Sequence, residues 1–299
     1  MKRLSQWLLA LAAFVFLNAS ALAAGKVQVT TSFSVLQDLV QVVGADRVEV
    51  HALVGPDEDA HVFEPKPTHA KRILQSQLVV TNGLGFEPWM AKLVKSSGYK
   101  GLVVQASDGV TARTMPAETG GGVETDPHAW QDPTNVILYV RNIAAGLSKL
   151  DPDGAAIYRA HAESYVAELQ KLDTWAQEQI ATIPAPKRKV ITSHDAFGYF
   201  GAHFGVTLLA PQGISTEAEP SAKGVAKLIR QIKQEQIKAV FLENMSNSKL
   251  ITQIAKDTGV ILGRPLFADA LSKSNAEGAS YLQLMRYNVK ALVEGMQMN

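Results

Sequence analysis

The chain has 299 residues, of which 46% are apolar and 19% are charged, an ordinary composition for a soluble globular protein with room for two domains. Lys and Arg number 29 against 28 Asp and Glu, which is not the strongly basic balance expected of a nucleic-acid-binding protein. The sequence contains no cysteine, so disulfides are excluded, and a metal site would have to use His, Asp, Glu and water.

The first segment, residues 1–24, has the pattern of a secretory signal peptide. Lys2 and Arg3 precede an apolar run from Trp7 to Leu17, and small residues follow. The run is too short for a spanning helix with proper flanks, and an uncleaved membrane anchor is the alternative. Removing Lys2 and Arg3 with this segment leaves 27 basic against 28 acidic residues. Because no cysteine is present to carry a lipid, we expect export to the periplasm without a lipid anchor.

Strand and helix patterns alternate in the first half, residues 25–150. Apolar runs typical of strands cover Lys26–Thr31, Val48–Val54, Leu78–Thr81 and Leu102–Gln105. Helical patterns separate these runs, over Phe33–Val43, Thr68–Gln75 and Pro88–Lys95. The polar, glycine-rich segment Met115–Glu124 is predicted to be a mobile loop. Alternation of this kind implies a parallel sheet with helices on both faces.

A long helix is predicted to link the two halves over residues 151–183. Asp151 suits an N-cap, and Pro152 suits the first helical position. Apolar residues then recur at intervals of four and three, which marks one helical face: Tyr158, Ala162, Tyr165, Leu169, Leu172 and Ala176. The helix is expected to end before Pro184 and to be long enough to cross both domains.

The second half, residues 184–299, repeats the alternation. Its predicted strands are Lys189–Thr192, Thr207–Ala210, Ala239–Leu242 and Val260–Pro265. Its predicted helices are Phe197–Phe204, Pro220–Gln234 and Lys249–Thr258. The turns after the first strand also match, Thr31–Ser34 in one half and Thr192–Asp195 in the other. We therefore predict an α/β protein of two related domains, each with a parallel sheet.

Four potential metal ligands each follow a predicted strand. They are His61, His128, His194 and Asp269, two from each half. Ligands of open parallel sheets bind beyond the carboxyl ends of the strands, so all four can line one cleft between the domains. Three imidazoles and a carboxylate suit Zn²⁺, which prefers about four N, S or O ligands. A lone histidine near a strand end is usually solvated or hydrogen-bonded, and the equivalent positions in both halves are what favour a shared site.

The other histidines are assigned no ligand role. His51 lies within a strand, His69 lies in the first turn of a helix, and His161 lies on the long helix. His203 falls one or two turns into the helix after His194. Four acidic residues near the ligands are candidates for orienting imidazoles or capping helices instead: Glu58, Glu64, Asp126 and Asp195.

At these residues the chain resembles the periplasmic zinc- and manganese-binding proteins of ABC importers, the cluster A-I solute-binding family. The resemblance covers the chain after the signal peptide and is carried by five segments: 59–65 (DAHVFEP), 82–89 (NGLGFEPW), 126–130 (DPHAW), 192–197 (TSHDAF) and 267–269 (FAD). It implies two Rossmann-like domains with parallel sheets, joined by a long rigid helix, with one metal between them. It also implies that His61, His128, His194 and Asp269 occupy the four ligand positions.

Two features of the chain indicate whether it is more similar to the zinc members or to the manganese members of that family. Manganese members typically have Glu at the third ligand position, where this chain has His194, as zinc members do. Many zinc members also carry a His-rich loop before the second ligand, yet residues 109–125 contain no histidine. This departure suggests loading by another route, such as a periplasmic metallochaperone.

We therefore expect a monomeric, non-enzymatic Zn²⁺ carrier that delivers its metal to an ABC permease in the inner membrane. Mn²⁺ or Fe²⁺ is the alternative cargo within the same family. A zinc-dependent hydrolase is an alternative of another class, but the sequence has no His-Glu-x-x-His motif, and four protein ligands leave no open position for water. An adhesin is a third possibility, against which the missing lipid anchor argues weakly.

Overall fold

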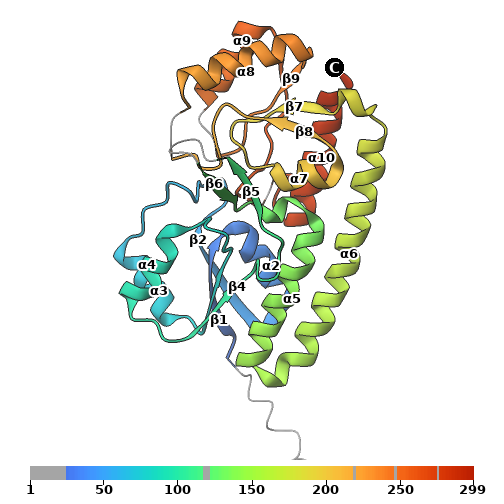
Figure 1. The fold of residues 1–299 in the computed structure, drawn as a ribbon. Helices are drawn as coiled ribbons and strands as arrows, with labels where there is room; N and C mark the ends of the chain where they lie inside the picture. The colour runs from blue at the N-terminus through green and yellow to red at the C-terminus, as the bar shows by residue number, and fades with distance from the viewer. Residues whose placement is uncertain (1–24, 117–121, 218–219, 246–247, 275) are drawn as a thin grey trace, which may run out of the picture.

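The computed structural model describes residues 25–116, 122–217, 220–245, 248–274 and 276–299. The predicted signal peptide, residues 1–24, lies outside the described residues. The described chain forms two α/β halves stacked end to end, with a long helix running beside both (Figure 1). This is the α/β architecture with two parallel sheets that the sequence predicts.

The first half is built on a parallel sheet whose strands have the order β2-β1-β3-β4. The strands are β1 (Val27–Phe33), β2 (Val48–Val54), β3 (Leu78–Thr81) and β4 (Leu102–Gln105). The crossovers contain α2 (Ser34–Gly44), α3 (Pro67–Gln75) and α4 (Pro88–Ser97). The valine-rich sequence of β1 and β3 suits strands that are covered by helices on both faces.

The second half repeats this topology with shorter strands. They are β7 (Lys189–Ile191), β8 (Thr207–Leu209), β9 (Ala239–Val240) and β10 (Ile261–Leu262), in the order β10-β9-β7-β8. Its helices are α7 (Gly198–Phe204), α8 (Ala222–Glu235), α9 (Ser248–Thr258) and α10 (Tyr281–Gln297). In each half the first strand lies between the second and the third. Both sheets therefore have the strand-order reversal beside which α/β proteins bind ligands.

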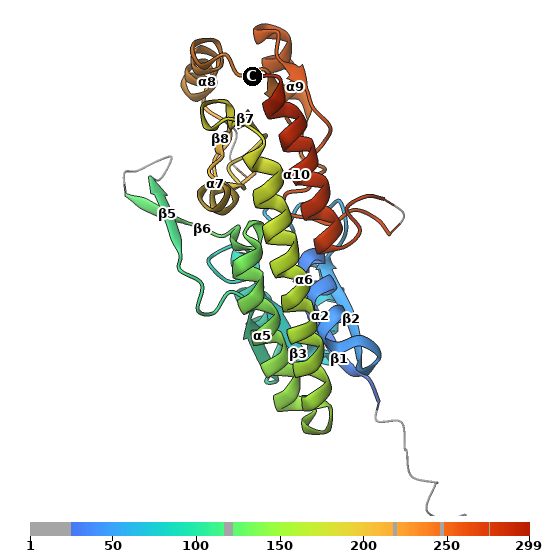
Figure 2. The same ribbon diagram turned by 90° about the vertical axis from the view of Figure 1, so that its right-hand side faces the viewer.

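The segment expected to be an irregular loop is bordered by paired strands. β5 (Arg113–Pro116) and β6 (Val123–Asp126) form an antiparallel ribbon. The ribbon projects from the body of the molecule in Figure 2. The prediction of a loop over all of Met115–Glu124 was therefore wrong at both ends, and residues 117–121 lie outside the described residues. The ribbon ends at Asp126, two residues before His128.

The long helix α6 (Ala155–Ala181) packs against α2 and α5 (Pro133–Leu150) of the first half and α10 of the second (Figure 2). Its predicted apolar face is buried from Tyr158 to Ala176. Asp151 caps the short 3-10 turn before it, because its side chain accepts a hydrogen bond from the Gly154 N–H. One apolar core contains residues of both halves and of α6. The boundaries of the two domains, with the first ending at residue 150 and the second beginning at residue 184, remain our proposal.

Candidate metal centre

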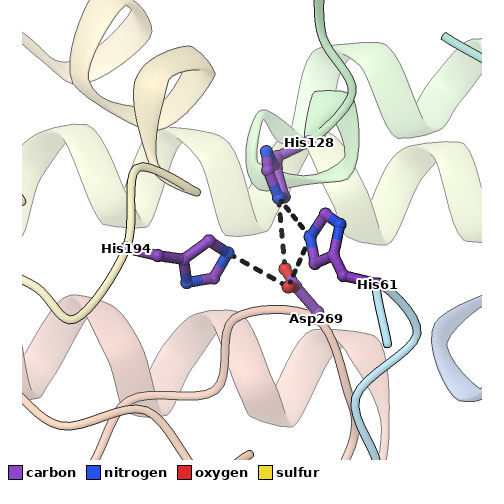
Figure 3. Close-up of side chains that lie close together, drawn as sticks. All are labelled: His61, His128, His194 and Asp269. Carbon is purple, nitrogen blue, oxygen red and sulfur yellow. Dashed lines mark hydrogen bonds and ion pairs between the residues drawn. The ribbon is translucent and has the colours of Figure 1, made fainter. Parts of the chain in front are cut away.

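The four predicted ligands converge on one point between the two halves. Figure 3 shows His61, His128, His194 and Asp269 reaching it from four different loops. His61 follows β2, His128 follows β6, His194 follows β7, and Asp269 follows β10. One ligand atom from each residue lies within 4.8 Å of all the others. The sequence prediction that these positions share one cleft therefore agrees with the structure.

Distances between these ligand atoms match the dimensions of a metal site. His61 Nε2 lies 3.3 Å from His128 Nε2 and 3.2 Å from Asp269 Oδ2. His194 Nε2 lies 3.1 Å from Asp269 Oδ2, and His128 Nε2 lies 3.6 Å from Asp269 Oδ1. Four ligands placed tetrahedrally about 2.0–2.1 Å from zinc would be about 3.3 Å apart. These donors lie close enough together to share one cation.

Burial makes the donors costly to leave without a partner. The side chains of His128, His194 and Asp269 are fully buried, and that of His61 is 4% exposed. Within the described residues, both Asp269 carboxylate oxygens and His194 Nε2 form no hydrogen bond of good geometry, and the polar atoms close to them are the other donors of the site. Buried polar atoms normally have well-formed hydrogen bonds, so this cluster of donors is a place where a cation would be bound.

Neighbouring carboxylates orient the imidazoles on each side of the site. Asp126 Oδ1 accepts hydrogen bonds from the backbone N–H of His128 at 3.0 Å and from its Nδ1 at 2.9 Å. Asp59 Oδ1 accepts one from the backbone N–H of His61 at 2.8 Å. With Nδ1 of His128 engaged in this way, its Nε2 is left facing the site, as a metal ligand requires.

Glu243 binds His194 on the side of the ring that faces away from the other ligands. The sequence analysis did not predict this role for Glu243. One carboxylate oxygen accepts hydrogen bonds from the backbone N–H groups of Ser193 and His194, and the other pairs with His194 Nδ1. Glu243 is buried and lies just beyond β9. Its position after a strand of the second half, like that of His194 and Asp269, was the signal that could have identified it.

Charge inside the site shifts two pKa values in opposite directions. Burial lowers the pKa of His194, but the carboxylates of Glu243 and Asp269 outweigh burial and raise that pKa well above its ordinary value. Burial raises the pKa of Asp269, but the imidazoles of His194 and His128 reverse this and hold that pKa well below its ordinary value. The raised pKa of His194 means that protons compete with a metal ion for this imidazole.

Aromatic side chains form the wall of the site in the first half. The ring of Phe86 meets the ring of His61 edge-on at 5.0 Å, and Trp130 lies 5.3 Å from the ring of His128. Trp130 Nε1 and Gln131 Nε2 both donate to the backbone carbonyl of Ala268, directly before Asp269. These contacts exclude water and fix the fourth ligand from the opposite half.

The remaining histidines lie away from the site, as expected. His69 Nδ1 accepts a hydrogen bond from the Lys66 N–H, and His161 Nδ1 contacts the Val43 carbonyl. His51 pairs with Glu49 on β2, and His203 pairs with Asp132 and Asp173 beside the helices. Of the other acidic candidates, Glu58 accepts from the Gly55 N–H, Glu64 is exposed, and burial raises the pKa of Asp195.

Comparison with known proteins places the chain in a family. The family model described as zinc-uptake complex component A, periplasmic, matches residues 29–295. The chain belongs to this family. Its members are solute-binding transport proteins rather than enzymes, and this chain is a metal-binding periplasmic component of an ABC importer.

Individual relatives carry names that refer to different metals. The chain is 32% identical over 269 residues to the manganese-binding lipoprotein MntA of Halalkalibacterium halodurans, covering 90% of this chain and 88% of the relative. It superposes on the periplasmic zinc-binding protein TroA from Treponema pallidum with a TM-score of 0.85, 27% identity and coverage of 91% and 99%. It also superposes on an Mn-bound periplasmic metal-binding protein from Candidatus Liberibacter asiaticus with a TM-score of 0.81 and 27% identity. That match covers 91% of this chain and 100% of the other.

Among the described residues, no helix is long and apolar enough to cross a membrane.

Proposed function

We propose that this protein captures Zn²⁺ in the periplasm and delivers it to a permease in the inner membrane. The observation that carries the proposal is the convergence of three buried imidazoles and one buried carboxylate on a single point. In this proposal His61, His128, His194 and Asp269 are the metal ligands. They come from both halves, so a bound metal would bridge the two halves.

The donor chemistry favours zinc as the cargo. Imidazole suits Zn²⁺, whereas Mn²⁺ sites are richer in carboxylate oxygen. Affinity at a given N/O site also rises from Mn²⁺ towards Cu²⁺ and remains high at Zn²⁺. Four protein ligands complete a tetrahedral zinc shell and leave no position for a reactive water, as suits a carrier.

Manganese is the second candidate, and the orientation of Asp269 supports it. Oδ1 faces His128, and Oδ2 faces His61 and His194, so both oxygens are directed into the site. A carboxylate that binds through both oxygens would give a fifth donor of the kind that Mn²⁺ prefers. The relatives named for manganese add weight to this alternative.

Delivery to the membrane is proposed from family membership. Relatives are named as lipoproteins, whereas this sequence contains no cysteine for a lipid to occupy. We propose that the protein acts as a monomer that diffuses between the metal source and the permease. Because residues 109–125 contain no histidine, a periplasmic metallochaperone is the proposed source.

The decisive experiment is elemental analysis of the purified protein, followed by competitive titration of the metal-free form with Zn²⁺ and Mn²⁺. We expect about one zinc per chain, held far more tightly than manganese. His194→Ala should weaken zinc binding by more than the roughly 100-fold lost with an outer partner of a ligand. His51→Ala, which changes a histidine outside the site, should leave the affinity unchanged. Tighter binding of manganese would move the protein to the second candidate.

A further inference from the structure

His61 is the ligand through which the site meets a solvent cavity. A cavity of about 690 Å³ is lined by the loop after β3, the β5–β6 ribbon, the segment after β8 and, alone among the four ligands, His61. Glu124 and Glu217 contribute carboxylates to its wall, and no lysine or arginine is among the described residues that line it. The negative charge of the wall suits the passage of a divalent cation to His61.

The loop that carries His61 is fastened to the second half of the molecule at three points. We call this segment, Gly55–His61, the latch loop. The Asp57 N–H donates to the Leu271 carbonyl at 2.9 Å, and Asn244 Nδ2 donates to Asp57 Oδ1 at 2.8 Å. The Thr216 hydroxyl donates to Asp59 Oδ2 at 2.7 Å. His61 thus lies directly after a segment held by residues from the opposite half.

Backbone strain accompanies these contacts. Asp57 has a φ of 60°, in the left-handed region that favours glycine. A residue other than glycine persists there only when its surroundings enforce the conformation, and such positions cluster at ligand clamps and switches. The turn at Asp57 is closed locally by the Glu58 N–H, which donates to the Gly55 carbonyl at 3.4 Å, and Asn244 and Leu271 fix this turn against the second half. Loss of those two contacts would free the turn from the second half.

We propose that the metal enters and leaves by displacement of His61 towards the cavity, and that the Asp57–Asn244 and Asp59–Thr216 hydrogen bonds set the rate. This inference rests on the proposed function. The bonds use Asp57 Oδ1 and Asp59 Oδ2, which are not ligand atoms, so they hold the loop to the second half independently of any contact with the metal. Weakening them should therefore speed association and dissociation together and leave the equilibrium constant nearly unchanged.

The test is stopped-flow transfer of Zn²⁺ from the protein to a chromophoric chelator, with the association rate measured separately. Thr216→Val removes the hydroxyl that bonds Asp59. Asp57→Gly removes the side chain that bonds Asn244 and retains the left-handed backbone. Each should raise both rate constants about fivefold, the effect of one net hydrogen bond. The two changes combined should raise them by an order of magnitude or more.

Matched variants distinguish the loss of these two hydrogen bonds from general damage to the fold. Thr216→Ser keeps a hydroxyl, and Asp57→Asn keeps an acceptor on a residue that tolerates the left-handed region, so both should restore rates close to those of the parent. Thr174→Val removes a hydroxyl that bonds the Gln170 carbonyl on α6, far from the site, and should change neither rate.

The outcomes separate the two proposals. A parent protein that binds neither Zn²⁺ nor Mn²⁺ would refute the proposed function. If the parent binds metal and the variants release it at the parental rate, the latch is refuted alone. A weaker equilibrium constant with an unchanged association rate also refutes it, because the bonds would then form only around bound metal. Joint acceleration, reversed in the Ser and Asn variants, supports it.

Discussion

At the scale of single residues, the proposed metal centre also depends on side chains that are not among its four ligands. Asp126 and Glu243 stand behind His128 and His194 and fix which ring nitrogen faces the site. With Asp269 they place three buried carboxylates in or beside the donor set. Buried charges need compensation, and a divalent cation supplies it at the point where these groups converge.

Replacement of Glu243 tests this supporting role. Glu243→Gln keeps the shape but removes the negative charge behind His194, so the imidazole becomes a poorer donor. Zinc affinity should fall about 10- to 100-fold in competitive titration. Glu235→Gln changes a carboxylate that pairs with Lys189 away from the site and should leave the affinity unaltered. Equal affinities for the two variants would show that Glu243 has no part in binding.

Three of the proposed ligand positions were predictable from sequence because each follows a strand of a parallel sheet, and parallel sheets gather their strand ends at one edge; His128 instead follows β6 of the antiparallel ribbon. The residues that orient these ligands were harder to predict from the sequence. Asp126 is two residues from His128, so it could be named as a candidate. Glu243 is 49 residues from His194, and only the pairing of β7 with β9 brings them together. Contacts of that kind depend on tertiary structure that no local pattern contains.

At the scale of elements, apolar patterns located the first sheet better than the second. The predicted bounds of β2, β3 and β4 agree with the structure, because valine-rich runs between turn residues mark them clearly. β9 and β10 are only two residues long, although the predicted apolar runs were longer. Backbone pairing ends sooner than the apolar run there, since those residues continue into loops that carry the site.

Three features of the helices and turns were not predicted. The helices α5 and α10 were not proposed from sequence, although Asp132 caps α5 by accepting from the Thr134 N–H and Ser280 caps α10 by accepting from the Gln283 N–H. The β5–β6 ribbon was taken for a loop because its strands are polar and short. Pairing between them, rather than burial, gives the ribbon its structure, and pairing leaves no apolar signal.

The buried face of α6 should contribute strongly to stability. Leu169 is fully buried within the core. Leu169→Ala should lower the free energy of unfolding by about 2–5 kcal/mol, through lost apolar contact and the cavity left behind. Urea denaturation measures the loss. The next residue, Gln170, is exposed, and Gln170→Ala should change stability by less than about 0.5 kcal/mol. Similar effects at both positions would contradict the assignment of the helix face.

At the scale of the whole molecule, α2 and α10 join the two halves directly. The carboxylate of Asp38 on α2 accepts a hydrogen bond from the N–H of Tyr281 at the start of α10. Leu271, from the second half, donates its N–H to the hydroxyl of Ser34 on the same helix α2. Together with α6 and the shared core, these bonds tie the two halves together.

Asp38 makes this junction sensitive to pH. Burial raises the pKa of its carboxyl from 3.8 to about 6, although the bond from the Tyr281 N–H opposes the shift. The folded state therefore holds this proton more tightly than the unfolded state, and the stability that the proton provides is lost as pH rises through about 6. Asp38→Asn, which keeps an acceptor, should be more stable than the parent by about 3 kcal/mol at pH 7.5.

Urea unfolding at several pH values measures this difference, which should shrink towards zero near pH 4. Asp153→Asn changes an exposed aspartate and should follow the parent at every pH. A stability gain for Asp38→Asn that is constant from pH 4 to 7.5 would mean that ionisation of Asp38 is not its cause.

The core shared by both halves also determines what a permease can recognise. Two lobes joined by flexible strands would change their outline on binding, and a membrane partner could then distinguish full from empty carriers by the distance between the lobes. Here α6, α2 and α10 hold that distance nearly constant. The difference between full and empty carriers is therefore expected to be local, at the edge of the cavity that His61 lines. We expect the permease to recognise that small patch rather than the overall shape of the carrier.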